Sequence, residues 1–139
     1  MTASISRVLL DRILEAARIG PDREICGLLL GRGEKIVAIL PAANVAADPA
    51  RRFEIDPAVL IAAHRRARDG GEAVLGHYHS HPGGEVVPSS CDAAMAHADG
   101  ALWLICDATG RHGLWRARGE GLYGMFDPVD LDVDDMARA

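Results

Sequence analysis

The sequence predicts a single globular domain of mixed α and β structure, and three observations support this fold class. The chain has 139 residues, of which 49% are hydrophobic, which suffices for one compact core and not for two domains. Short apolar runs typical of buried strands alternate with segments in which apolar residues recur at helical spacing. Glycine and proline separate these segments. We therefore expect strands and helices that intermix in an α/β or α+β sandwich.

Three segments combine helical spacing with suitable end residues. Asp56 is a favourable N-cap, and Pro57 is favoured at the first position of a helix. Glycine stops each of the three patterns. The expected helices run from Val8 to Ala17, from Pro57 to Ala67 and from Ser89 to Ala98.

Apolar runs bounded by turn-forming residues predict the strands. The first two runs are joined at Gly33-Glu34, which suggests a hairpin, and the last two at Thr109-Gly110. Residues 41–51 are rich in Ala, Asn and Pro and are typical of a connecting loop. The expected strands are Glu24–Gly31, Lys35–Leu40, Phe53–Ile55, Ala73–His79, Ala101–Cys106 and Gly113–Arg116.

Composition excludes several classes of protein. No apolar run approaches the roughly 20 residues of a membrane-spanning helix, and the N-terminus lacks the layout of a secretory signal, so we expect a soluble, cytoplasmic protein. Cys26, Cys91 and Cys106 form no CxxC pair, which favours reduced thiols. The net charge of -5 argues against a nucleic-acid partner, because phosphate binding needs a concentrated basic surface.

The negative charge is concentrated at the C-terminus. Residues 127–139 hold five Asp and one Arg, which gives -4 and leaves -1 of the total -5 for the rest of the chain. We expect residues 1–126 to form the domain and residues 127–139 to be an acidic tail. The simplest interpretation of this tail is a solvated or frayed end, and the alternative is a segment that docks a basic partner.

Two histidines and an aspartate have the spacing of a metal site. On an extended strand, His79 and His81 point to the same face and can bind one ion. Asp92 lies just inside the helix that begins at Ser89. If the loop before this helix folds back toward the strand, it can bring the Asp92 carboxylate up as a third ligand. Two nitrogens and one oxygen leave a fourth tetrahedral position for water, as in catalytic rather than structural zinc sites.

Each of these residues has an ordinary explanation when it is taken alone. A strand histidine is usually packed or solvated, and an aspartate in the first turn of a helix is favoured by the helix dipole. The full pattern is more restrictive: His-Ser-His-Pro, six residues, Ser, two residues and Asp. It therefore favours a metal site over four unrelated residues.

This pattern resembles the motif of the JAMM, or MPN-plus, metalloproteases. Residues 79–92 match that motif without departure, and the segment Glu24–Gly31 is similar to the family's first segment, in which a glutamate precedes a Gly-Leu-rich strand. The order of elements agrees over roughly residues 5–126. The resemblance implies an MPN-type mixed β-sheet with flanking helices, in a layered architecture like that of cytidine deaminases.

The resemblance also implies roles for particular residues. His79, His81 and Asp92 would bind Zn2+, and Glu24 would take a proton from the attacking water and return it to the leaving amine. The Ser89 hydroxyl would support the oxyanion. The implied activity is that of a zinc metallopeptidase, a deubiquitinase-like isopeptidase.

The implied substrate is a ubiquitin-like or sulfur-carrier protein with a C-terminal Gly-Gly. Its extended tail would pass the zinc, since only glycine fits a narrow groove, and it could pair with a sheet edge. The short loop between His81 and Asp92 leaves no room for a substrate-selecting insertion, so we expect broad specificity.

Several alternatives stay open at this point. Glu85 is a rival base, because it lies in the loop beside the expected ligands. His77 lies on the same strand face as His79. It is a fourth ligand, a neighbour that supports the ligands, or simply a packed or solvated side chain. Asn44 orients substrate or simply makes a turn.

Two other functions compete with the hydrolase. A non-catalytic MPN scaffold keeps this fold but lacks metal ligands, whereas all key positions are filled here. A zinc deaminase needs a His-x-Glu and a Pro-Cys-x-x-Cys pair, neither of which occurs in this chain.

Overall fold

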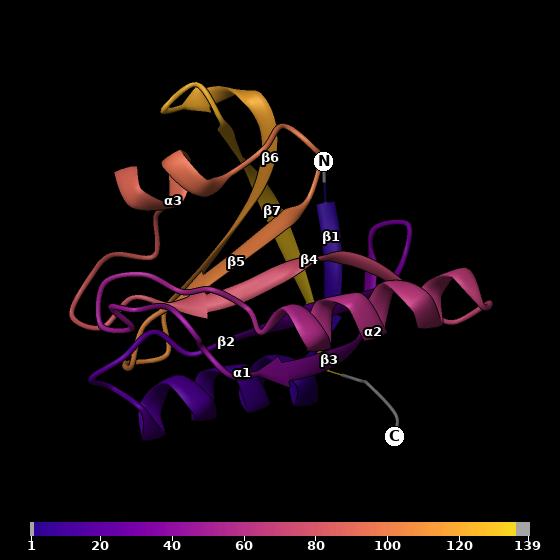
Figure 1. Ribbon diagram of the computed structural model, residues 1–139, viewed down its shortest axis with the longest axis horizontal. Coiled ribbons are helices and arrows are strands. Elements are labelled where there is room, and N and C mark those ends of the chain that lie inside the picture. The colour runs from indigo at the N-terminus through magenta and orange to yellow at the C-terminus, as the bar shows by residue number, and fades with distance from the viewer. Residues whose placement is uncertain (1, 136–139) are drawn as a thin grey trace.

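The computed structural model describes residues 2–135 and has the mixed α and β architecture that the sequence predicts (Figure 1). Within those residues, seven strands form one sheet that closes on itself in the order β1-β3-β2-β4-β5-β6-β7. The strands are β1 (Thr2–Ser6), β2 (Cys26–Arg32), β3 (Lys35–Ala42), β4 (Ala73–Ser80), β5 (Leu102–Cys106), β6 (His112–Leu122) and β7 (Phe126–Asp134). The helices are α1 (Arg7–Ile19), α2 (Pro57–Arg68) and α3 (Ser90–Met95).

Strand β4 is hydrogen-bonded on both sides, antiparallel to β2 and parallel to β5. The parallel pair requires a long connection between the two strands, and this connection contains α3. Near the C-terminal end of β4, His79 is opposite Cys26 of β2 on one side and Ile105 of β5 on the other. The fold therefore brings the start of β2 and the end of β4 together, and α3 lies close to the same end (Figure 1).

A side chain caps the start of each of the first two helices, and only the cap at Asp56 is predicted from the sequence. The Ser6 hydroxyl accepts a hydrogen bond from the Leu9 amide at the start of α1, and the Asp56 carboxylate accepts one from the Ala58 amide at the start of α2. Helix α1 buries Leu10 and Ile13 in the main hydrophobic core. Burial of each such side chain contributes about 1.5–3 kcal/mol, which is why this short amphipathic helix is stable here.

A second hydrophobic cluster lies beside the metal-site residues. Its buried aromatic members are Phe53, Trp103 and Phe126. The Trp103 ring lies edge-on to Phe126, with ring centroids 5.0 Å apart, and edge-on to His77, at 4.3 Å. These aromatic side chains pack against the face of β4 from which the histidine side chains project.

The sequence predicts that the acidic segment is a solvated or frayed end, and the structure differs in that the segment is an ordered strand. It forms β7, which pairs parallel to β1 and antiparallel to β6. Its aspartates alternate with Val129, Leu131 and Val133, so the charged side chains face solvent while the apolar ones face the protein. The expected domain boundary after Phe126 therefore falls inside a strand, and residues 136–139 lie outside the described residues.

Three further elements differ in extent from the expectation. Helix α3 ends at Met95 rather than Ala98, since the backbone is already extended at Ala96, with φ -78° and ψ 153°. Strand β6 continues to Leu122. Residues 53–55 form no strand; only Ile55 makes a bridge, to Asn44.

None of the helices in residues 2–135 has the length and hydropathy to span a bilayer. Cys26, Cys91 and Cys106 are free thiols, as the sequence predicts.

Candidate metal centre

The end of β4 presents two histidines toward the same point. His79 lies within the strand and is fully buried, and His81 follows directly after it and is 8% exposed. The Ser80 amide donates to the Ile25 carbonyl at 3.1 Å, and the His81 amide donates to the Cys106 carbonyl at 2.8 Å. The backbone on which both imidazoles stand is therefore held from two sides.

Asp92 reaches this point because of the way α3 begins. Ser89 is the N-cap, and its hydroxyl accepts a hydrogen bond from the Asp92 amide at 3.0 Å. The Ser89 amide in turn donates to Asp92 Oδ2 at 2.9 Å, which completes a capping box. This reciprocal pair fixes the carboxylate, which is only 1% exposed, on the side of the helix that faces β4.

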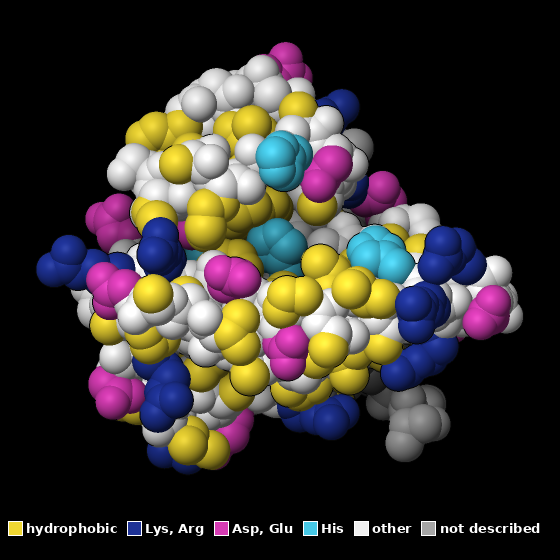
Figure 2. Space-filling view, viewed as in Figure 1, with side chains coloured by type: hydrophobic (Ala, Val, Ile, Leu, Met, Phe, Trp, Pro, Cys, Tyr) yellow, Lys and Arg dark blue, Asp and Glu magenta, His cyan; other side chains and the backbone are white. Residues whose placement is uncertain are grey.

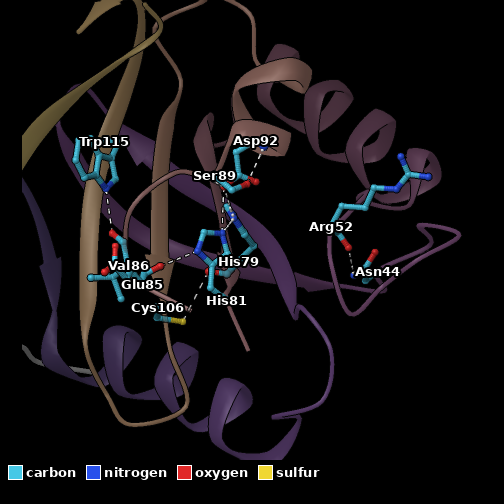
Figure 3. A network of polar contacts seen from close by, with 10 residues as sticks. All are labelled: Asn44, Arg52, His79, His81, Glu85, Val86, Ser89, Asp92, Cys106 and Trp115. Carbon is cyan, nitrogen blue, oxygen red and sulfur yellow. Dashed lines mark hydrogen bonds and ion pairs between the residues drawn. The ribbon is translucent and has the colours of Figure 1, made fainter. Parts of the chain in front are cut away.

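The three donor atoms form a compact triangle (Figure 3). His79 Nε2 and His81 Nε2 are 3.0 Å apart, and Asp92 Oδ2 lies 3.3 Å from the first and 3.1 Å from the second. Ligand atoms about 2.0–2.2 Å from a tetrahedral zinc lie about 3.3–3.6 Å from one another. The triangle matches this spacing to within a few tenths of an ångström, so the donor set fits Zn2+.

The loop between the histidines and α3 orients the second imidazole. His81 Nδ1 lies 2.7 Å from the Glu85 carbonyl oxygen, so it is this nitrogen that carries the proton and donates (Figure 3). The neighbouring Val86 carbonyl accepts from the Trp115 indole at 3.2 Å, which anchors the loop to β6. His81 Nε2 is thereby left with its lone pair toward the metal position.

The first imidazole is held by stacking. The ring of Phe53 lies 4.2 Å from that of His79 at an interplanar angle of 21°. His79 Nδ1 is buried and has no hydrogen-bond partner. Packing against Phe53 therefore replaces the hydrogen bond that usually orients a metal-binding histidine.

Glu24 joins the three residues from the segment just before β2. One carboxylate oxygen lies in a group of four potential ligand atoms, all within 4.8 Å of one another. The side chain is 4% exposed, and Oε1 has no hydrogen-bond partner. Burial, to which the charge of Asp92 adds, raises the pKa of Glu24 from 4.5 to about 7, against the opposing influence of His81. A carboxyl group with such a pKa can both accept and release a proton near neutral pH.

Two of the other three groups, His79 and Asp92, have the charges that a metal site needs. Burial lowers the pKa of His79, which keeps this imidazole neutral. Burial would raise the pKa of Asp92, but hydrogen bonds from both histidines and from the Ser89 amide hold it well below the usual range. His81 differs from them: burial opposes the change, but its hydrogen bonds to Asp92 and to the Glu85 carbonyl raise its pKa. In the metal-free protein a proton therefore competes with a metal for this imidazole.

Two residues that the sequence left open lie outside the group of donor atoms. His77 is packed between the rings of Phe53 and Trp103, and burial lowers its pKa to about 3. Glu85 contacts His81 through its backbone carbonyl, and its carboxylate is not part of the group.

Three residues with structural roles at the site were missed or left open by sequence reasoning. The Ser80 hydroxyl accepts a hydrogen bond from the Ile25 amide at 2.9 Å and so ties β4 to the segment that carries Glu24. Phe53 stacks on His79, and Asn44 bonds to the Glu24 backbone. Ser80 lies inside the recognised motif and could have been found there, whereas no local pattern marks Phe53.

Two cavities adjoin the site. One, of about 430 Å3, is lined by Glu24, His81 and Ser89, with Arg51 and Tyr123 at its rim. The other, of about 540 Å3, lies between α2, β4 and the segment after α3, with His77 among its lining residues. Figure 2 shows a hollow on this face, with histidine side chains in and around it.

The chain is similar to several known proteins. A family described as prokaryotic homologs of the JAB domain matches residues 6–118. Desampylase from Haloferax volcanii is 37% identical over 107 residues, which are 73% of this chain and 77% of that protein. A probable TtuB-protein conjugate cleaving protease from Thermus thermophilus is 36% identical over 74 residues, which are 53% of this chain and 49% of that protein.

The fold is also similar to a solved structure. The crystal structure of a JAB1/MPN domain protein from Archaeoglobus fulgidus superposes with a TM-score of 0.61 at 24% identity, covering 97% of this chain and 100% of that one. The family match and the identity to the Haloferax protein together show that this chain belongs to the prokaryotic homologs of the JAB domain, a small prokaryotic branch of the JAMM/MPN family.

Proposed function

We propose that this protein is a zinc-dependent isopeptidase that hydrolyses amide or isopeptide bonds after the C-terminal tail of a ubiquitin-like or sulfur-carrier protein. The observation that carries this proposal is the triangle of two imidazole nitrogens and one carboxylate oxygen beside the buried Glu24 carboxylate, whose Oε1 has no hydrogen-bond partner. The names of the related desampylase and conjugate-cleaving protease agree with it. A non-catalytic scaffold is disfavoured, since such a protein has no need of a complete donor set.

In this proposal, His79, His81 and Asp92 hold the metal. A bound Zn2+ supplies a Lewis acid that polarises a carbonyl and lowers the pKa of water to about 7. The neutral imidazole of His79 and the ionised carboxylate of Asp92 are the protonation states that such a role requires.

Glu24 is the proton carrier. It removes a proton from the attacking water as the new bond between the water oxygen and the carbonyl carbon forms. It then gives that proton to the leaving nitrogen as the carbon–nitrogen bond breaks. Its pKa of about 7 suits both steps, because neither proton transfer is then strongly uphill.

Ser89 stabilises the charge that develops on the carbonyl oxygen. Its hydroxyl oxygen accepts the Asp92 amide hydrogen, so its own hydrogen is free to donate. The same residue lines the cavity next to Glu24 and His81, where a scissile carbonyl would lie. Such donors act on the transition state more than on the substrate.

The substrate tail is proposed to end in Gly-Gly. Residues without side chains can pass close to Glu24 and Ser89 without clashing with either wall of the cavity. The short loop after His81 adds no substrate-selecting insertion, which favours broad specificity. The cytoplasmic location expected from the sequence stays a prediction.

The proposal is tested with purified protein and a ubiquitin-like protein joined to a lysine side chain through its C-terminal Gly-Gly. We expect about one zinc per chain by metal analysis and release of the intact ubiquitin-like protein by mass spectrometry. Chelation and the change Glu24→Gln should each abolish release. Metal-loaded protein that binds the conjugate without cleaving it would instead indicate the scaffold function.

A further inference from the structure

The segment that carries Glu24 is held by a loop rather than by the metal-binding residues alone. The Glu24 amide donates to the Pro49 carbonyl at 2.7 Å, and the Glu24 carbonyl accepts from Asn44 Nδ2 at 2.8 Å. Asn44 and Pro49 both belong to the connection between β3 and α2. Both backbone groups of Glu24 are therefore bound by this connection, residues 43–56, which we call the clamp loop.

Asn44 is the hub of the clamp loop. Its Nδ2 donates to the Arg52 carbonyl at 3.0 Å (Figure 3). It also donates to the Glu24 carbonyl, and the Pro49 carbonyl oxygen is more distant at 3.5 Å. Its Oδ1 accepts from the amides of Ala46 and Glu54, both at 3.0 Å. An amide has two donor hydrogens and two acceptor lone pairs, and all four are used here. Among the other side chains, only glutamine has the same two donors and two acceptor lone pairs, and it is one methylene longer.

The same loop also contacts a metal-binding residue. Phe53 comes directly after Arg52, is 6% exposed and stacks on the His79 ring at 4.2 Å. The clamp loop thus binds the backbone of Glu24 at one place and the imidazole of His79 at another. Asn44 connects the two places, since it bonds to the residues on either side of Phe53.

We infer that Asn44 is a positioning residue, which sets the place of the Glu24 carboxylate relative to the metal-binding side chains. This inference rests on the proposed function. Glu24 precedes β2, and the Glu24 carboxylate has an oxygen, Oε1, with no hydrogen-bond partner to orient it. Its position therefore depends on its backbone, and a displacement of about 1 Å at a reacting group can reduce turnover about 100-fold.

Asn44→Asp is the discriminating variant. It keeps the oxygen that accepts from Ala46 and Glu54, so the loop retains half of its hydrogen bonds, but it loses the donors to Glu24 and Arg52. We expect kcat to fall tenfold or more, with KM within about threefold of wild type and zinc content unchanged. Val45→Ala, at an exposed neighbouring position, is the matched control and should leave kcat unchanged.

The measurements separate positioning from simple support of the fold. Kinetics are compared at a temperature at which circular dichroism shows every variant folded, and Asn44→Gln, which restores both donor and acceptor, should recover part of kcat. Folded, zinc-loaded Asn44→Asp with the kcat of wild type would overturn the inference. So would a loss confined to KM or to zinc content. Failure of the wild-type protein to cleave the conjugate would count against the proposed function instead.

Discussion

Replacement of Glu24 by glutamine should abolish hydrolysis and stabilise the metal-free protein at alkaline pH. The buried carboxyl group has its pKa raised from 4.5 to about 7. The difference of about 2.5 corresponds to about 3 kcal/mol, because one pKa unit is worth about 1.36 kcal/mol. Since the side chain opens on a cleft where solvent screens part of its charge, we expect about 2 kcal/mol of this to be observed.

The direction in which stability changes with pH follows from proton binding. The folded protein binds the Glu24 proton more tightly than the unfolded chain, so this contribution to the free energy of unfolding is complete below about pH 4.5. It is lost as the pH rises to about 7. Glutamine has the same shape and no ionisable group. Relative to the variant, wild type should therefore lose about 2 kcal/mol between pH 4.5 and pH 8.

Urea unfolding in the presence of a chelator measures this effect. The free energy of unfolding is determined for wild type and Glu24→Gln at several pH values, with the exposed Glu120→Gln as a control. The control should follow wild type, because its carboxylate is hydrated in both states. Parallel pH profiles for wild type and Glu24→Gln would refute the reasoning, since they would mean that burial costs this carboxylate nothing.

Four further predictions concern other parts of the fold and the site. Ser89→Ala removes the N-cap of α3 and the proposed oxyanion donor, so we expect a loss of about 1 kcal/mol in stability and of about 100-fold in kcat, measured by urea unfolding and by conjugate cleavage. His81→Ala should abolish the rise in unfolding temperature that zinc causes in wild type, as calorimetry with and without zinc would reveal. Burial opposes the shift, but hydrogen bonds from Arg111 and Thr109 hold the pKa of Asp107 well below its usual range. Asp107→Asn should therefore lower the free energy of unfolding by about 1–3 kcal/mol at pH 7, and by progressively less as the pH falls below about 4. An equal loss of stability at pH 3 would contradict this. Tyr123 has a φ of 55°, so Tyr123→Gly should raise the free energy of unfolding by about 1 kcal/mol in thermal denaturation.

The proposed metal-binding residues could be named from the sequence because their geometry is mostly local. The alternation of a strand places His79 and His81 on one face, and the capping box places Asp92 within one turn of Ser89. Only the fold of the loop between them had to be assumed. The spacing of the motif thus carries almost all of the information needed to place these donor atoms.

The proposed general base, Glu24, could not be placed in the same way. Glu24 meets the histidines because β2 pairs antiparallel with β4 and Cys26 is opposite His79. No local pattern specifies that register, so the assignment of Glu24 depended on the resemblance to a family. The interpretation of Asn44 as a simple turn residue was incomplete for the same reason, since its bond to the Glu24 carbonyl crosses between two distant segments.

The acidic strand β7 was misjudged for a different reason. Its content of aspartate suggested a solvated end, yet Asp130 and Asp132 alternate with Leu131 and Val133 in the two-residue period of a strand. The periodicity of this segment predicts a strand, whereas its net charge predicts a solvated end. Pairing with β1 then removes the exposed edge that such a strand would otherwise have.

One part of the site comes from a local sequence motif and the other from long-range strand pairing, so mutations in the two parts should have different effects. Changes at His79, His81 or Asp92 act on the local constellation and should alter zinc content and turnover together. Changes at Glu24 or Asn44 act on the part that long-range pairing brings in, so they should reduce turnover while zinc stays bound. A variant of Asn44 that lost its zinc would show that the clamp loop supports the metal, through Phe53 and His79, more than it supports the base.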